Sequence, residues 1–453
     1  MNDRFDSDRF VWLAGIEDTC VYPPGEFEMR PLDEYDLTEH TLHWREDLDA
    51  VRSLGASAVR YGVNWPLVHP AEGEFDWTML DERLDYATRE LGLTVVADLV
   101  HYGTPTWLTA SFADARYPAA VADFAGRFAA RYRGVVDHIT PLNEPLTTAS
   151  FCGLRGIWPP ALTGWDGWTR VTLGIVHGMA ATIDAVRAAN PEAVIVHVEA
   201  SSLYRSDDPG LQAHANLLES VGLLPTDLLL GLVGPDHDRH DWLLAHGAHA
   251  DELARLTENP PTIDIMGVNY YPDLSPRTLT GPASEVVQHA TNRWTDGLAQ
   301  SLRRYEARYG LPLLITETSI EGDDETRTSW FDASTRLVDE LREDGMDIRG
   351  YTWWPLLDFV DWSYATGGRN VEEFALPDEL VQARRSSTDV LAAPDGTADT
   401  VVAKTPFLRR MGLLRLDETP DGSLDRVWTD AAHRYQQRAA ESLAASDADE
   451  SHA

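Results

Sequence analysis

Two glutamates follow short apolar runs, and a pair of this kind could cleave a glycosidic bond. Glu144 follows Thr-Pro-Leu-Asn, and Glu317 follows Leu-Ile-Thr. A retaining glycosidase needs two carboxyls about 5–5.5 Å apart, one protonated to assist the leaving oxygen and one ionised to attack the anomeric carbon. We therefore predict a retaining β-glycosidase with Glu144 and Glu317 as its catalytic pair.

Eight short apolar runs alternate with longer amphipathic stretches and could position this pair. We predict strands over Phe10–Gly15, Ala58–Val63, Thr94–Val100, His138–Leu142, Val194–Val198, Ile263–Val268, Leu313–Thr316 and Arg349–Trp353. Near-continuous apolar runs are typical of parallel strands that are buried on both faces. Repeated eight times with helices between, they predict an α/β fold of the (β/α)8 TIM barrel type. The alternative is an open doubly wound sheet, which usually has a glycine-rich turn after its first strand, and no such turn follows here.

The chain is expected to form one barrel domain over residues 1–441. A segment rich in Gly, Ala, Asp, Ser and Thr follows the eighth predicted strand, so we expect a long surface loop at about 366–404. Residues 442–453 are mostly Ala, Ser, Asp and Glu, which predicts a disordered acidic tail.

Polar and aromatic residues gather at the carboxyl ends of the predicted strands. These ends meet on the face of a barrel that carries the catalytic residues. The residues in question are Glu17, Arg60, His101, Asn143, Glu144, Asn269, Tyr271, Glu317, Trp354, Asp361 and Trp362. Because aromatic rings stack on the C–H faces of a sugar while polar groups bind its hydroxyls, this set predicts a small carbohydrate substrate.

Five ordered segments match the motifs of one enzyme family. Residues 140–145 read Thr-Pro-Leu-Asn-Glu-Pro against an acid/base motif Thr-x-Asn-Glu-Pro, with one extra residue. Residues 315–317 match the start of the nucleophile motif Ile-Thr-Glu-Asn-Gly, while Thr318-Ser319 replace its last two positions. Three further matches lie at 267–271, 350–362 and 410–413. Over most of its length the chain thus resembles a divergent branch of glycoside hydrolase family 1, the β-glucosidase-type retaining barrel enzymes.

This resemblance implies a retaining exo-β-glycosidase with Glu144 as the acid/base and Glu317 as the nucleophile. It also implies a role for each of the remaining residues. It implies that Arg60 lies beneath the nucleophile and keeps it ionised, and that Tyr271 orients the nucleophile through a hydrogen bond. It also implies that Asn143 binds the 2-hydroxyl of the sugar. The other residues that it assigns to the sugar site or its support are His101, Asn269, Trp354, Asp361 and Trp362.

Three departures from the family pattern fall on sugar recognition. Glu17 is the candidate replacement for a sugar-binding glutamine, Tyr102 stands where the family has tryptophan, and Asp361 stands where it has glutamate. We therefore expect the chemistry to persist, whereas a β-glucoside and a β-galactoside both stay open as substrates. Tyr102 itself is interpreted as a wall residue of the site.

The charge of the chain limits its partners. The formal net charge is −37 over 453 residues, which argues against nucleic acid and anionic membranes as partners. The negative charges also repel one another within the chain. Molar salt, where the Debye length is roughly 3 Å, screens this repulsion, so we predict the cytoplasmic protein of a halophile. An acidic enzyme of an ordinary organism is the alternative.

Other sequence features indicate no cofactor. The chain has two cysteines, Cys20 and Cys152, and no clustered Cys/His pattern, so we expect neither a disulfide framework nor a metal site. The N-terminus lacks the basic start and apolar stretch of a secretory signal. A homo-oligomer is left open.

Three other functions compete with simple hydrolysis. The same site could act mainly as a transglycosylase, which product analysis with a sugar acceptor would reveal. A non-catalytic sugar-binding protein of this fold would be favoured by the loss of either glutamate, but both are present. A phosphosugar hydrolase would need cations after the eighth strand, where Arg369 is the first.

Overall fold

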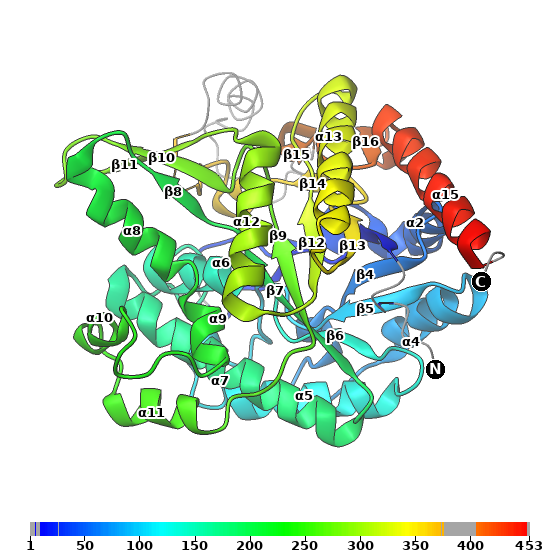
Figure 1. The fold of residues 1–453 in the computed structure, drawn as a ribbon. Coiled ribbons are helices and arrows are strands. Elements are labelled where there is room, and N and C mark those ends of the chain that lie inside the picture. Colours follow the sequence, from blue (N-terminus) through cyan, green and yellow to red (C-terminus); the bar gives the residue numbers. More distant parts are fainter. Residues whose placement is uncertain (1–4, 6–9, 26, 373, 376–404, 451–453) are drawn as a thin grey trace.

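A closed parallel barrel of eight strands forms the centre of the molecule (Figure 1). The computed structural model describes residues 5, 10–25, 27–372, 374–375 and 405–450. The barrel strands are β1 (Val11–Gly15), β4 (Ala58–Gly62), β5 (Thr94–Asp98), β6 (His138–Thr140), β7 (Val194–Ala200), β9 (Ile265–Asn269), β12 (Leu313–Thr318) and β13 (Ile348–Trp353). Each coincides with one of the eight predicted strands, so the predicted TIM barrel is confirmed.

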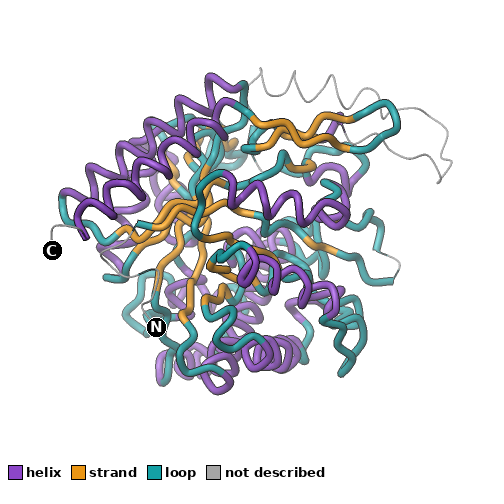
Figure 2. Tube along the Cα trace, turned by 90° about the vertical axis from the view of Figure 1, so that its right-hand side faces the viewer, coloured by secondary structure: helices purple, strands orange, loops and turns teal. Residues whose placement is uncertain are grey.

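The strands close in the order β1-β13-β12-β9-β7-β6-β5-β4, and all neighbours are parallel. Figure 2 shows the strands at the centre, with helices packed around them. Because parallel neighbours must be joined by crossovers, every carboxyl end of a strand lies on the same face of the barrel.

Helices cover the outside of the barrel. The α-helices are α1 (Glu34–Leu37), α2 (His40–Ser53), α3 (Trp65–Val68), α4 (Thr78–Asp85), α5 (Tyr117–Arg131), α6 (Pro145–Ala149), α7 (Gly164–Ala189), α8 (Gln212–Val221), α9 (Leu224–Leu229), α10 (His240–Ala245), α11 (Ala250–Glu258), α12 (Trp294–Tyr309), α13 (Asp324–Glu343) and α15 (Asp430–Glu450). Short 3-10 and π segments add η1 (Tyr86–Glu90), η2 (Ser111–Ala113), η3 (Ser150–Leu154), η4 (Pro209–Leu211), η5 (Trp362–Thr366) and η6 (Thr405–Phe407).

The helix α13 illustrates how the sequence sets these elements. Asp323 caps its start by accepting a hydrogen bond from the Thr326 N–H, and acidic residues occupy its first turn. Its buried residues recur at helical spacing, including Trp330, Phe331 and Val338. This apolar stripe packs the helix against the barrel.

Small sheets follow several barrel strands. They pair β2 (Cys20–Val21) with β3 (Leu32–Asp33), β10 (Pro276–Thr280) with β8 (Leu203–Arg205) and β11 (Val287–Ala290), β14 (Phe359–Val360) with β15 (Leu408–Arg409), and β16 (Leu414–Glu418) with β17 (Leu424–Trp428). In Figure 1, β8, β10 and β11 lie beside α8 on one side of the barrel.

The core has an inner and an outer part. In β1, Val11 and Leu13 belong to a compact apolar cluster with residues of β4, β5, β7, β9 and β12. The alternate residues of the same strand, Trp12 and Ala14, belong to the larger cluster that includes helix residues. This alternation follows from the period of two of a strand, which turns successive side chains to opposite faces.

Two predictions about irregular segments have different outcomes. The helix α15 continues to Glu450, so the prediction of a disordered tail is wrong over 442–450, while 451–453 lie outside the described residues. Alanine, abundant in this segment, is the best helix former, and its propensity extends a helix whose earlier residues Tyr435 and Ala439 are buried. Most of the predicted 366–404 loop lies outside the described residues. Among the described helices, none combines the length and apolarity needed to cross a bilayer.

Candidate active site

A cavity of about 180 Å³ opens at the carboxyl ends of the barrel strands. Both predicted catalytic residues, Glu144 and Glu317, line it. So do the following residues that the sequence placed in the site: His101, Asn269, Tyr271, Trp354, Asp361 and Trp362. Three others, Glu17, Arg60 and Asn143, are fully buried beneath this lining.

Glu317 projects from an irregular part of β12. The pairing register of β12 against β9 shifts between Ile315 and Glu317, and such a bulge re-aims the side chains near it. One carboxylate oxygen of Glu317 accepts a hydrogen bond from Arg60 Nη1 at 2.6 Å, and the other accepts one from the Tyr271 hydroxyl at 2.7 Å. The geometry thus matches the roles that the resemblance implies for Arg60 and Tyr271.

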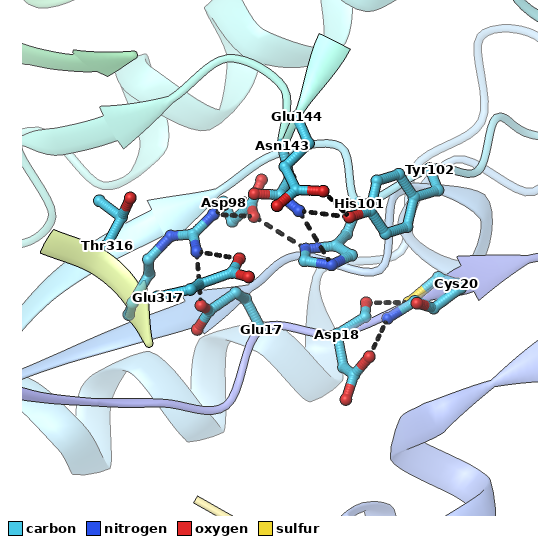
Figure 3. A network of polar contacts seen from close by, with 12 residues as sticks. Glu17, Asp18, Cys20, Asp98, His101, Tyr102, Asn143, Glu144, Thr316 and Glu317 are labelled. Carbon is cyan, nitrogen blue, oxygen red and sulfur yellow. Dashed lines mark hydrogen bonds and ion pairs between the residues drawn. The ribbon is translucent and has the colours of Figure 1, made fainter. Parts of the chain in front are cut away.

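Arg60 holds four acceptors in one buried network (Figure 3). Its Nη1 donates to Glu17 as well as to Glu317, at 2.6 Å each. Its Nη2 donates to Asp98 and to the Asn143 side-chain oxygen, at 2.8 Å each. A buried carboxylate without a partner costs folding free energy. The Arg60 guanidinium is the shared partner that lets Glu17, Asp98 and Glu317 lie under the site.

Burial governs the charge of Glu317. Burial raises its pKa to about 7, although the Arg60 guanidinium lowers it; the Glu144 carboxylate nearby raises it further. Arg60 acts in the expected direction, but desolvation is the larger effect.

Glu144 lies at the start of α6 in an unusual backbone conformation. Its φ of 44° falls in the left-handed region, which a non-glycine residue seldom adopts. Its Oε1 accepts a hydrogen bond from Asn269 Nδ2 at 2.7 Å, and its Oε2 accepts one from the Tyr102 hydroxyl at 2.8 Å. Glu199 holds the following turn by accepting the Leu146 N–H at 3.2 Å. The carboxyl is therefore fixed from both sides.

Tyr102 is more than the wall residue that the sequence suggested. Figure 3 shows its ring beside His101 and its hydroxyl between Asn143 and Glu144. The hydroxyl accepts from Asn143 Nδ2 at 3.0 Å while it donates to Glu144. The replacement of the family's tryptophan by tyrosine was the sequence signal for this contact.

Two of the residues predicted to bind the sugar lie beneath the cavity lining. Glu17 does not line the cavity; its carboxyl is buried on Arg60, and burial raises its pKa well above the usual range. Asn143 is likewise fully buried, and its amide binds Arg60, Tyr102 and His101. Both side chains thus contact the groups of the site from below.

The residues that the sequence predicts to bind a sugar include His101, Trp354 and Trp362, which line the cavity. His101 Nδ1 lies 3.0 Å from an Asp98 carboxylate oxygen, which orients the ring. The indole N–H groups of Trp354 and Trp362 are bonded beneath the site, to the Glu17 carbonyl at 2.7 Å and to the Thr19 hydroxyl at 3.0 Å. Their faces are thereby held in fixed orientations at the cavity wall.

Arg409 is a residue of this site that the sequence interpretation missed. It lines the cavity and is bound to Glu321 at 2.6 Å, with Asp361 at 3.6 Å and Glu372 at 3.9 Å. Its place next to the closing motif at 410–413 was the only sequence signal. Asp361 thus shares its end of the cavity with a cation and a second carboxylate.

Comparisons with known proteins agree with this description. The family model Glyco_hydro_42, described as beta-galactosidase, matches residues 38–130. A thermostable beta-glucosidase B of Thermobispora bispora is 27% identical over 403 residues, 79% of this chain and 80% of that protein. A bifunctional beta-D-glucosidase/beta-D-fucosidase of Bifidobacterium breve is 25% identical over 74% of this chain and 83% of its own length.

Solved structures show the same fold. The family 1 β-glucosidase of Thermotoga maritima in complex with isofagomine lactam superposes with a TM-score of 0.76 at 16% identity, covering 96% of this chain and 98% of that one. The chain is thus similar in sequence to β-glucosidases over most of its length and shares the barrel fold of a family 1 β-glucosidase.

Proposed function

We propose that the protein is a retaining exo-β-glycosidase that hydrolyses β-linked glycosides by double displacement. The observation that carries the proposal is the pair of carboxyls on one cavity. Glu317 is held between Arg60 and Tyr271, and Glu144 is held by Asn269 and Tyr102. This arrangement supplies both groups that glycoside hydrolysis with retention requires.

In the first step, a Glu317 oxygen bonds to the anomeric carbon as the bond to the leaving oxygen breaks. Glu144 gives its proton to that leaving oxygen, so the aglycone departs as a neutral alcohol. The glycosyl ester on Glu317 carries no negative charge. Because that charge no longer opposes ionisation, Glu144 can accept a proton from water, which then releases the sugar.

The sugar is expected at the end of the cavity that holds His101, Trp354, Asp361 and Trp362. Trp354 supplies a ring on which the sugar can stack, while His101 and Asp361 supply hydrogen-bonding groups for its hydroxyls. Arg409 adds donors beside Asp361. Its charge is offset by the carboxylates around it, so a neutral sugar suits this end better than a phosphosugar.

A panel of nitrophenyl β-glycosides tests the proposal. We expect hydrolysis of a β-glucoside or β-galactoside, with the β-anomer of the free sugar observed first by NMR. An α-anomer as the first product, or no turnover of any member, would contradict the proposal. Transglycosylation is the alternative, and the ratio of transfer product to free sugar at increasing acceptor concentration measures it.

The hydroxyl of Tyr102 should set the alkaline side of the pH profile. In the wild type we expect kcat/KM to fall on the alkaline side, where Glu144 no longer carries the proton for the leaving oxygen. The Tyr102 hydroxyl donates to Glu144 and stabilises its ionised form. Tyr102→Phe should therefore move the alkaline fall upward by about one pH unit.

The control is Tyr86→Phe, which removes a hydroxyl bonded to Asp49 on the surface, at 2.7 Å. It should leave the profile unchanged. A Tyr102→Phe enzyme that loses activity equally at every pH would show that the hydroxyl only supports the structure.

We also propose that the protein works in concentrated salt in the cytoplasm of a halophile. The support is the net charge of −37, whose self-repulsion falls as salt shortens the Debye length. Activity and Tm should both rise between dilute buffer and roughly 1 M KCl, where the Debye length is about 3 Å. Full activity and stability without added salt would overturn this proposal.

A further inference from the structure

The cavity extends over two sectors of the barrel mouth. Barrel order places β6, β7 and β9 side by side, and the segments that follow them form one sector. The residues proposed to bind the sugar follow β5 and β13. These two strands are the outer members of the other half of the ring, β13-β1-β4-β5. Glu144 follows β6 and Glu317 lies on β12, so the catalytic pair separates the two sectors. If the sugar occupies the second sector, the leaving group must occupy the first.

The first sector has an apolar wall beside its polar side chains. Leu146 comes from α6, Trp165 from the start of α7, Leu218 and Val221 from α8, and Leu274 from the turn after β9. Leu218 and Val221 are at most 7% exposed. Leu218 also belongs to a satellite apolar cluster against which Trp165 packs. The wall here is thus a built apolar surface and not a chance exposure of single residues.

The carboxylates of the lining divide in the same way. Among the described residues, the carboxylates that line the cavity are Glu144, Glu317, Asp361 and Glu372. The first two are the catalytic pair, and the other two lie near Arg409 at the sugar end. No lining carboxylate among the described residues belongs to the apolar sector, although the chain carries 74 acidic residues.

Two of the polar groups in this sector, Ser275 and Arg277, are engaged with the protein. The Ser275 hydroxyl accepts a hydrogen bond from the Tyr271 N–H at 3.0 Å. Arg277 donates to Gln288 at 3.1 Å, and its guanidinium lies 4.3 Å from the Phe374 ring centroid. A second sugar bound here would turn several hydroxyls toward aliphatic walls, where they would lose hydrogen bonds to water.

We propose that the leaving group of the natural substrate is an apolar alcohol or phenol with a ring or long hydrocarbon chain, not another sugar. This inference rests on the proposed glycosidase function and names its substrate class. Transfer of such a group from water to the Leu146–Leu218–Val221 wall is favourable, and the gain scales with the apolar area that is buried. The enzyme would then release apolar aglycones from their β-glycosides instead of shortening oligosaccharides.

The nitrophenyl panel first identifies the preferred sugar. The test then compares two substrates that carry this sugar, its octyl β-glycoside and a disaccharide in which it is β-linked to a second sugar. Octanol is the poorer leaving group, so leaving-group acidity works against the expected preference. We expect kcat/KM for the octyl glycoside to exceed that for the disaccharide by about tenfold or more. Preference for the disaccharide would overturn the inference.

Variants of the wall make the test specific. Leu218→Asn should lower the ratio of kcat/KM for the octyl glycoside to kcat/KM for the disaccharide by about tenfold. Val221→Thr conserves the shape of the side chain and should fold in any case, and it should lower this ratio by a smaller factor. Leu42→Asn is the matched control, because Leu42 is 76% exposed on α2, away from the cavity, and the ratio should not change. An unchanged ratio in folded Val221→Thr and Leu218→Asn enzymes would overturn the inference. Failure to hydrolyse any glycoside would instead contradict the proposed function.

Discussion

Replacement of Glu317 by alanine should lower hydrolysis of an aryl β-glycoside by about 10⁴-fold or more, because no other group can form the covalent intermediate. The carboxylate is the one that Arg60 and Tyr271 hold at the cavity floor. Azide should restore turnover by entering the space left by the side chain. Since azide then attacks once, with inversion, the product should be the α-glycosyl azide, identified by NMR.

The matched control is Glu72→Ala, which removes a glutamate that does not line the cavity and whose side chain is 69% exposed. It should retain wild-type kinetics. A Glu317→Ala enzyme that keeps near wild-type rates, or yields only β-glycosyl azide, would end the assignment of this residue as nucleophile.

Replacement of Glu144 by alanine should have an effect that depends on the leaving group. A dinitrophenyl aglycone departs without a proton, so the first step should remain fast, whereas an alkyl glycoside should lose about 10³-fold or more. The second step lacks its base, so the glycosyl-enzyme should accumulate and appear as a burst of dinitrophenol. Azide should attack this intermediate and give the β-glycosyl azide. Equal losses for all leaving groups would contradict the acid/base role.

The barrel could be predicted from the sequence because its strands are buried on both faces. That environment demands nearly continuous apolar runs such as Val194–Val198, and eight of them recur with helices between. The meeting of Glu144 and Glu317 on one cavity could be expected as well, since both are charged residues placed directly at the ends of such runs.

The network beneath the pair could not be predicted, because it depends on side-chain direction and on contacts across the barrel. Glu17 and Asn143 follow strands in the expected way, yet both turn under the cavity to reach Arg60. The Tyr102–Glu144 contact joins residues 42 positions apart, and Arg409 reaches the site from a segment beyond the last barrel strand. A one-residue register shift in β12 also changes which side chains face the mouth. The pattern of apolar residues along the strand does not predict this shift.

The left-handed backbone conformation at Glu144 lowers the stability of the fold at the residue that is proposed to act as acid/base. A side chain in this conformation costs about 1 kcal/mol or more relative to glycine, so the fold carries the acid/base at the expense of its own stability. Glycine at this position would relieve the strain and remove the proton donor together. Laboratory evolution selected for heat resistance alone would therefore drift toward inactive barrels, and a thermostable form of this enzyme has to be sought by screening turnover and melting in the same round.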